Sequence, residues 1–124
     1  MAHASASIGT TNYAVSISTG HHQFNADEGA GLGGKDVGPA PYELLCAALC
    51  ACTAITLRMY AERKGWPLRA VNVDVRFKEG AITRVLSFEG ELDDGQRARL
   101  ADVAERTPVT LTLKQGLPVT TTLQ

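Results

Sequence analysis

Residues 38–65 read GPAPYELLCAALCACTAITLRMYAERKG, the most informative segment of the chain. Pro41 suits the first turn of a helix, where its missing N–H leaves no hydrogen bond unmade. Residues 44–57 carry no charged side chain, and a helix that is apolar on every side is expected to be buried on every side. Gly65 supplies a C-terminal stop signal. The stretch therefore predicts one long, buried helix over about residues 41–64.

Strands are predicted on both sides of this helix. Residues 13–18 alternate apolar and polar side chains, as a half-buried strand does, and a second strand follows through Phe24. Residues 71–78 show the strictest alternation in the chain, and another strand covers about residues 82–89 after a turn at Gly80. Both pairs have the short connections that are typical of antiparallel hairpins.

A short helix and two final strands complete the expected order. Asp93 and Gln96 have the spacing of a capping box that opens a helix, and Pro108 is expected to end that helix. Alternating apolar residues predict two last strands, over about residues 109–113 and 119–123. The order of strands and helices indicates an α+β fold with mostly antiparallel sheets packed on the long helix, in a single domain.

Composition indicates an ordinary soluble protein. Of 124 residues, 44% are hydrophobic and 20% are charged, with a formal net charge of −1 and a pI near 6.3. This balance gives no electrostatic footprint for nucleic acid or an anionic membrane surface. The charge-free run of 14 residues is shorter than the roughly 18 that a membrane span needs. We expect residues 1–11, which are small and polar, to form a loose leader without secretion-signal character. With three clustered cysteines, the chain is expected in the cytoplasm.

A helix that is apolar on every side needs more cover than this chain offers. Two thin sheets and one amphipathic helix provide little material to surround it. A second copy of the chain would complete the cover, and closed two-fold dimers dominate protein oligomers. We therefore predict an obligate homodimer with the long helices near its centre. The alternative is a monomer whose sheet wraps around the helix.

Two motifs that would indicate a bound cofactor or metal are incomplete. Residues 29–35, GAGLGGK, nearly match a phosphate-binding loop, but Asp36 stands where the motif needs Ser or Thr, and its carboxylate would repel phosphate. His21 and His22 are adjacent, so on a strand they would point to opposite faces. No metal-ligand spacing accompanies them. We expect no nucleotide, no metal and no other cofactor.

All three cysteines lie on the long helix. Cys46 and Cys50 share one face, whereas Cys52 lies on another face with Leu49 and Thr56. A reactive thiol needs a nearby cation and some access, and nothing within the helix supplies that charge to Cys52. The cation would have to come from a loop or from a partner subunit. Periodicity alone favours structural cysteines, because free cysteine behaves as a small buried hydrophobe.

The long-helix motif resembles the OsmC/Ohr family. The likeness rests on residues 38–53, GPAPYELLCAALCACT, and on the continuation through residues 57–65. In that family a loop rich in glycine and proline opens the helix, and a cysteine follows about three turns later. The likeness continues through residues 86–107 to a Pro-Val pair. It implies an intertwined homodimer of two sheets that flank central helices.

The resemblance also implies a chemistry. Well-studied relatives reduce organic and sometimes inorganic hydroperoxides: one thiolate attacks the peroxide oxygen, a second cysteine closes a disulfide, and a dithiol donor reopens it. An arginine polarises the first thiolate, and a glutamate orients that arginine.

Carried over residue by residue, the resemblance makes Cys52 the attacking thiolate. The family's glutamate directly follows the proline, where this chain has Tyr42. Glu43 comes one residue later and is the candidate for orienting the cation. No arginine stands in the N-terminal strands or loop, where Lys35 is the candidate cation. The family's second cysteine precedes the Pro-Val pair, and here that residue is Thr107.

Two functions remain open. The first is a one-cysteine, thiol-dependent hydroperoxide reductase of oxidative-stress defence, which takes a small organic hydroperoxide and an external thiol reductant. The second is a non-peroxidase dimer that binds a small apolar ligand at the subunit interface. The absence of the second cysteine and of the N-terminal arginine favours this second function. Five residues are candidates for contacting the bound molecule: Tyr42, Leu49, Cys50, Thr56 and Thr107.

Overall fold

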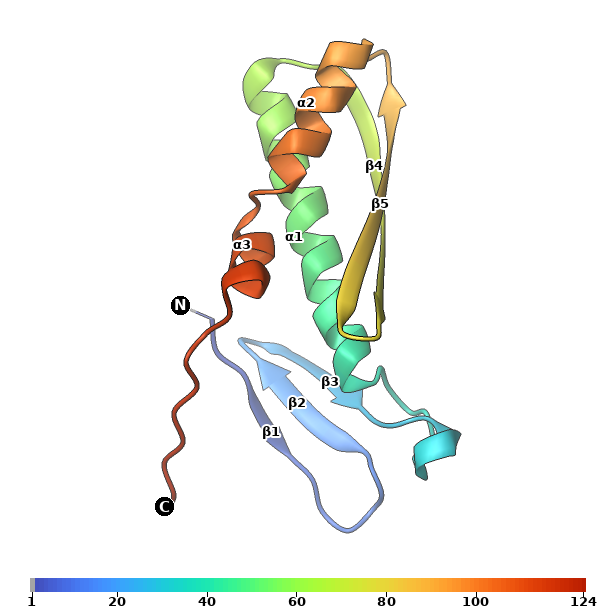
Figure 1. Cartoon of the computed structure of the whole chain (residues 1–124). Helices are drawn as coiled ribbons and strands as arrows, with labels where there is room; N and C mark the ends of the chain where they lie inside the picture. The colour runs from blue at the N-terminus through green and yellow to red at the C-terminus, as the bar shows by residue number, and fades with distance from the viewer. Residues whose placement is uncertain (1) are drawn as a thin grey trace. The chain divides into compact units, whose positions relative to one another are not determined.

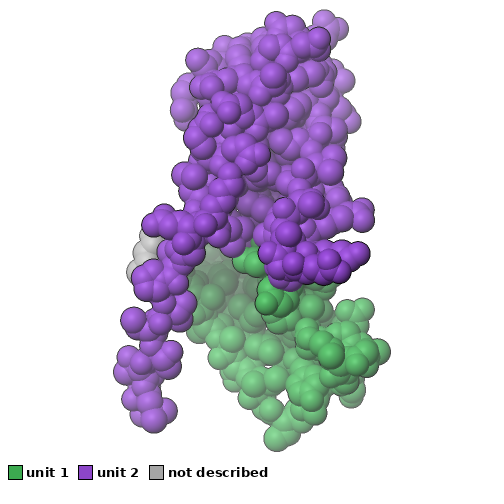
Figure 2. All heavy atoms as spheres, in the orientation of Figure 1, with its two compact units in different colours: residues 1–45 green, residues 46–124 purple. Residues whose placement is uncertain are grey.

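The protein is represented by a computed structural model that describes residues 2–124 and separates into two compact units, Met1–Leu45 and Cys46–Gln124 (Figure 2). The predicted α+β class, with antiparallel sheets and one long helix, is confirmed. The elements, in chain order, are β1 (Ser5–Ser7), β2 (Val15–Thr19), β3 (His22–Ala26), the 3-10 helix η1 (Ala30–Leu32), α1 (Pro41–Lys64), β4 (Leu68–Lys78), β5 (Ala81–Gly90), α2 (Asp94–Ala104) and α3 (Pro108–Gln115).

The first unit contains an antiparallel sheet in the order β1-β2-β3. The two predicted strands correspond to β2 and β3. The expectation of a loose leader is wrong for Ser5–Ser7, which pairs with β2 because that strand's free edge offers backbone partners. The two histidines also differ from expectation. The turn at Gly20 extends through His21, so only His22 lies in β3. The centroids of the two imidazole rings are 4.2 Å apart.

The glycine-rich loop of the first unit folds around an internal carboxylate. Asp27 is 3% exposed and accepts hydrogen bonds from the backbone N–H groups of Tyr13 at 3.0 Å, Glu28 at 2.7 Å, Lys35 at 3.1 Å and Val37 at 3.3 Å. One of these donors, Lys35, belongs to residues 29–35, which nearly match a phosphate-binding loop, and Glu28 and Val37 lie on either side of that segment. These N–H groups are thus directed at the protein's own anion.

The pKa of Asp27 makes this loop sensitive to acid. Burial raises that pKa, but the four backbone donors together outweigh burial and hold it below the ordinary value. A carboxylate with a lowered folded-state pKa stabilises the fold above its unfolded value of about 3.9, and this stabilisation is lost as pH falls through the folded-state pKa. We expect Asp27→Asn to lower Tm at neutral pH, and the difference from wild type to shrink below about pH 4. Thermal unfolding at a series of pH values measures this. The exposed Asp36→Asn is the matched control, and equal losses in both variants would contradict the prediction.

In the second unit, β4 and β5 form the antiparallel hairpin that the alternating sequence predicted. Its turn is Glu79-Gly80, and both residues have positive φ, +53° and +76°, as a tight two-residue hairpin turn requires. Figure 1 shows this hairpin running alongside α1 and α2. Its half-buried face turns alternate side chains towards the helices.

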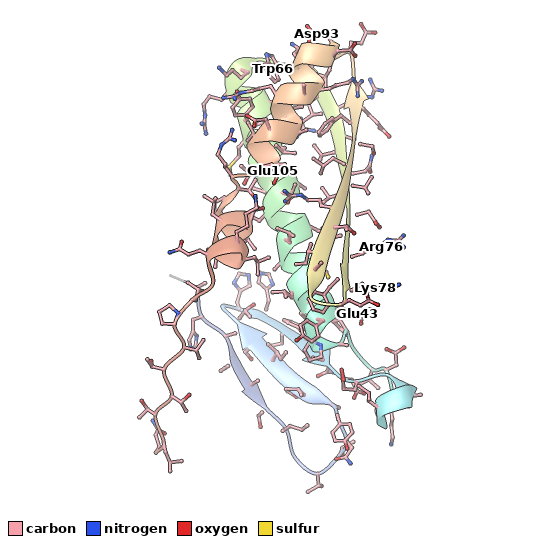
Figure 3. All side chains as sticks on the ribbon, in the orientation of Figure 1. Glu43, Trp66, Arg76, Lys78, Asp93 and Glu105 are labelled. Carbon is pink, nitrogen blue, oxygen red and sulfur yellow. The ribbon has the colours of Figure 1, made fainter. Side chains whose placement is uncertain are left out.

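The second short helix begins as predicted. The Asp93 side chain accepts from the N–H of Gln96 at 2.7 Å, and the Gln96 side chain accepts from the N–H of Asp93 at 2.9 Å, which completes a capping box. Figure 3 shows Asp93 and Trp66 at the end of the unit where α1 ends and α2 begins. The core between these helices and the hairpin consists of Leu57, Ala61, Leu68, Leu100 and Ala104.

Within this chain α1 is buried along one face only. Its buried residues are spaced four apart, which places them on one stripe: Leu49, Thr53, Leu57 and Ala61. On the other side Ile55 is 55% and Met59 54% exposed. The expectation of all-round burial is therefore not met by one copy of the chain.

By length and composition α1 could cross a membrane, although only 22% of its most apolar window is buried. The sequence expectation, which counted only the charge-free run, was too strict. The core helix of a soluble protein passes the same test of length and composition.

The predicted C-terminal strands are wrong. Pro108–Gln115 forms the helix α3, and residues 116–124 have no regular structure. The helix α2 already ends at Ala104, and Pro108 begins α3 instead of ending α2. Thr107 has the extended backbone of an N-cap, and proline is well suited to the first helical position. The alternating pattern from Val109 onward looked like a strand, but α3 turns Val109, Thr110 and Leu113 inward at helical spacing.

Candidate functional site

The Cys52 thiol lies beside the beginning of α3. Its Sγ accepts a hydrogen bond from the N–H of Val109 at 3.5 Å and is 3.9 Å from the hydroxyl of Thr56, one helical turn along α1. The cysteine is half-buried and free. The first N–H groups of a helix lack intrahelical partners and carry partial positive charge. The Cys52 sulfur thus accepts one of the N–H groups that α3 cannot pair within itself.

A hydrogen-bonded network around Arg84 adjoins this thiol. The guanidinium donates from Nη1 to the hydroxyls of Thr53 at 3.0 Å and Thr110 at 2.9 Å, and from Nη2 to the carbonyl of Ala104 at 2.8 Å. Thr110 also donates to that carbonyl at 3.3 Å and shares a 2.6 Å hydrogen bond with Thr107. One side chain from β5 therefore joins α1, the end of α2 and the first turn of α3.

The charge of Arg84 is only partly balanced. Its nearest carboxylate oxygen is Glu105 Oε2 at 3.9 Å, and the same oxygen binds Lys114 Nζ at 2.9 Å. Figure 3 shows Glu105 where α2 gives way to α3. The hydrogen bond and charge of Lys114, and more weakly the charge of Arg84, hold the pKa of Glu105 below its ordinary value. The exposed carboxylate of Glu105 thus forms ion pairs with both Arg84 and Lys114.

The candidate residues on α1 of the second unit separate into different environments. Thr56 lies beside Cys52, as the helical stripe predicted. Leu49 is only 4% exposed and its carbonyl accepts the hydroxyl of Thr53, so it belongs to the core. The Cys50 thiol donates towards the carbonyl of Val73 on β4 at 3.7 Å, a different direction from Cys52. Thr107 lies outside α1, at the N-cap of α3, and is 1% exposed.

The other candidates belong to the first unit. Glu43, the third residue of α1, accepts the N–H of Ala40 at 2.9 Å, which stabilises the start of the helix. Tyr42 is 62% exposed, and Lys35 is exposed with its backbone N–H bound to Asp27. Any contribution of these three side chains to Cys52 stays a prediction.

Arg84 was missed in the sequence, although a signal was present. In residues 82–88 the alternation places Ile82, Arg84, Leu86 and Phe88 on the same half-buried face of β5. A charged residue in register with apolar ones indicates a buried cation with specific partners. The N–H of Val109 was missed for another reason, because a strand was expected there.

The structure also shows a shallow groove and no metal cluster. The groove, of about 460 Å³, lies along the exposed side of α1 and is lined by Ala54, Ile55, Arg58, Met59, Glu62 and Val71. Within residues 2–124, no three His, Cys, Asp or Glu side chains come close enough together to hold a metal ion.

Comparison with known proteins identifies similar chains. The family model described as OsmC-like protein matches residues 33–122, whereas no curated protein matches the chain. A solved structure of an osmotic stress induced and detoxification response protein from Psychrobacter arcticus aligns with a TM-score of 0.76 at 16% identity, covering 88% of this chain and 85% of that one. An OsmC-like protein from Mycoplasma pneumoniae aligns with a TM-score of 0.74 at 16% identity, covering 92% and 87%.

One further structure carries a bound molecule. An organic hydroperoxide resistance protein from Vibrio cholerae aligns with a TM-score of 0.68 at 20% identity, covering 92% of this chain and 84% of that one. It holds captopril in one of its active sites. At these identities the three structures establish a shared fold.

Proposed function

This chain belongs to the family of OsmC-like proteins, and we propose that it is a thiol-dependent hydroperoxide reductase in which Cys52 attacks the peroxide. The observation that carries the proposal is the N–H of Val109 on the Cys52 sulfur. A half-buried thiol at the first turn of a helix combines access with stabilisation of the thiolate. Of the three cysteines, Cys52 is also the one at the motif's thiol position.

The proposed reaction has two stages. The Cys52 thiolate attacks one peroxide oxygen, the O–O bond breaks, and Cys52 becomes a sulfenic acid while an alkoxide leaves and takes a proton from solvent. An external thiol then forms a mixed disulfide with Cys52 and releases water. A second thiol restores the Cys52 thiol and leaves as the reductant's disulfide.

The external reductant follows from what surrounds Cys52. Thr107 carries a hydroxyl where the family's second cysteine would stand, and the Cys50 thiol is directed at β4. Neither arrangement closes an internal disulfide, so the reductant attacks Cys52 directly. The Vibrio cholerae relative holds captopril in one of its active sites, which supports a site in this fold that admits a small molecule.

We propose further that the chain acts as a homodimer in the cytoplasm. The exposed apolar side of α1 supports a dimer, because a second copy of the chain could bury Ile55 and Met59. The C-terminal segment adds apolar surface, with Leu117, Val119 and Leu123 at least 69% exposed.

The test is the intact mass of the reduced protein after brief exposure to stoichiometric organic hydroperoxide, with the modified residue mapped. We expect the mass of one oxygen atom to be added at Cys52, and a small thiol to reverse it. Further oxidation to the sulfinic acid should follow excess peroxide, since no internal thiol traps the sulfenic acid. An unchanged Cys52 would refute the proposal.

A Thr107→Cys variant provides an internal comparison. Thr107 precedes the α3 turn that contacts Cys52, so a thiol there should trap the sulfenic acid as a disulfide. The expected mass change is then the loss of two hydrogen atoms instead of the gain of oxygen.

The second candidate function is binding of a small apolar ligand without peroxide chemistry. The groove along α1 favours it, because its lining is mainly apolar with one residue of each charge, Arg58 and Glu62. Saturable binding of a fatty-acyl probe that Met59→Glu abolishes, together with a Cys52 that hydroperoxide leaves unmodified, would establish this function in place of the first.

A further inference from the structure

Arg84 is a cation inside the second unit, on the half-buried face of β5. Its side chain is 12% exposed and lies on a strand face that otherwise carries apolar residues, including Ile82 and Leu86. Removing a charge from water is costly unless the charge is well paired. Here the nearest carboxylate, that of Glu105, is 59% exposed, 3.9 Å away and shared with Lys114. The positive charge of Arg84 is therefore only partly balanced by Glu105.

The hydrogen bonds of Arg84 reach the residues next to Cys52 and next to its donor Val109. Nη1 donates to Thr53, the residue after Cys52, and to Thr110, the residue after Val109. Each of these hydroxyls accepts from Nη1 and donates onward, Thr53 to the carbonyl of Leu49 and Thr110 to that of Ala104. The Thr53 and Thr110 hydroxyls therefore each use their donor and an acceptor site within this network.

We propose that Arg84 is a positioning residue of the Cys52 site. It ties the first turn of α3 to α1, so that the N–H of Val109 stays directed at the Cys52 sulfur. The link to peroxide reduction rests on the proposed function, whereas the effect on thiolate reactivity does not.

Lysine would be an incomplete replacement. A guanidinium presents several donors in a rigid fork and reaches Thr53 and Thr110 together, whereas an ammonium is a compact point charge on a flexible stem. The charged groups around the Arg84 guanidinium are Glu105 at the end of α2 and Lys114 on α3. Glu105, with its lowered pKa, stays ionised at neutral and alkaline pH, so it adds no titration of its own there.

The test compares the rate at which iodoacetamide alkylates Cys52 across a pH series, with sites mapped by peptide mass. For Arg84→Met we expect at least about a tenfold lower rate near pH 7, and a rate close to wild type near pH 10, where any thiol is ionised. Arg84→Lys should lie between the two. A folded Arg84→Met with the wild-type profile would overturn the proposal, as would an equal loss at every pH.

Two further variants separate positioning from stability. Arg97 also joins backbone carbonyls, those of Phe88 and Gly90, but it does not touch the residues around Cys52. Arg97→Met should therefore lower stability and leave the Cys52 profile unchanged. If Arg84→Met does not fold, Thr110→Val is the alternative, because it keeps the charge of Arg84 and removes a hydroxyl to which Arg84 donates. It should slow alkylation of Cys52 near neutral pH, and a wild-type profile in both Thr110→Val and Arg84→Lys would overturn the proposal.

The outcome is distinguishable from that of the proposed function. An Arg84-dependent alkylation profile with no oxidation by hydroperoxide would refute peroxide reduction and support the role of Arg84. If hydroperoxide oxidises Cys52 but the pH profile of Cys52 alkylation is the same in wild type and Arg84→Met, peroxide reduction would be supported and the role of Arg84 overturned.

Discussion

A Cys52→Ser variant should lose hydroperoxide consumption by at least about 100-fold, to the level of the thiol reductant alone, because removing the nucleophile removes the covalent step itself. A serine hydroxyl fits the same space beside Val109 and Thr56 but is a far weaker nucleophile at neutral pH. The measurement is the initial rate of organic hydroperoxide loss at fixed protein and thiol concentrations.

Cys46→Ser is the control for this variant. Cys46 is also free and half-buried on α1, yet it does not share the contact with α3. We expect it to keep wild-type activity within about twofold, the range expected where no catalytic group is lost. Equal activity in the two variants would remove Cys52 from the mechanism.

An Ile55→Glu variant should convert the dimer into a monomer. Ile55 is 55% exposed on the uncovered side of α1, in the middle of the surface that a second copy is proposed to bury. Burying an isoleucine contributes ~1.5–3 kcal/mol, and burying an unpaired carboxylate in its place costs more. The dissociation constant should therefore rise by more than about 100-fold.

Light scattering during size-exclusion chromatography measures this change. Wild type should elute at twice the chain mass of 13.2 kDa, and Ile55→Glu at 13.2 kDa. Ala101→Glu is the matched control, since Ala101 is an exposed alanine on α2 away from the proposed interface. A wild-type protein of 13.2 kDa would contradict the dimer. So would an Ile55→Glu variant that stays at twice that mass.

Local chemistry explains why several elements were predictable. The bounds of α1 follow from a proline at one end and a glycine at the other, with a continuous apolar run between them. The Glu79-Gly80 turn and the Asp93 capping box involve residues only one to three positions apart. Such signals are complete within a few residues of chain, so tertiary packing only needed to agree with them.

The C-terminal helix shows where local reasoning was insufficient. Residues 109–113, VTLTL, have both the alternation and the β-branched content of a strand. The structure forms a helix there because Pro108 follows an N-cap and because Thr110 finds buried partners in Arg84 and Thr107. Those partners are 26 residues away in one case and three in the other, so no short window of sequence contains the whole cause.

The fold class and the long helix could be predicted from the sequence, because periodicity, proline and glycine act over a few residues, and the motif resemblance singled out Cys52. The surroundings of Cys52 became apparent only once the chain was folded. Tertiary packing placed the N–H of Val109 against the sulfur, directed Cys50 elsewhere and brought Arg84 from the far strand to the same helix junction. The physical reason is that a thiol's reactivity depends on charges and donors within a few ångströms, and these arrive from distant parts of the chain only when the helices and the hairpin have packed.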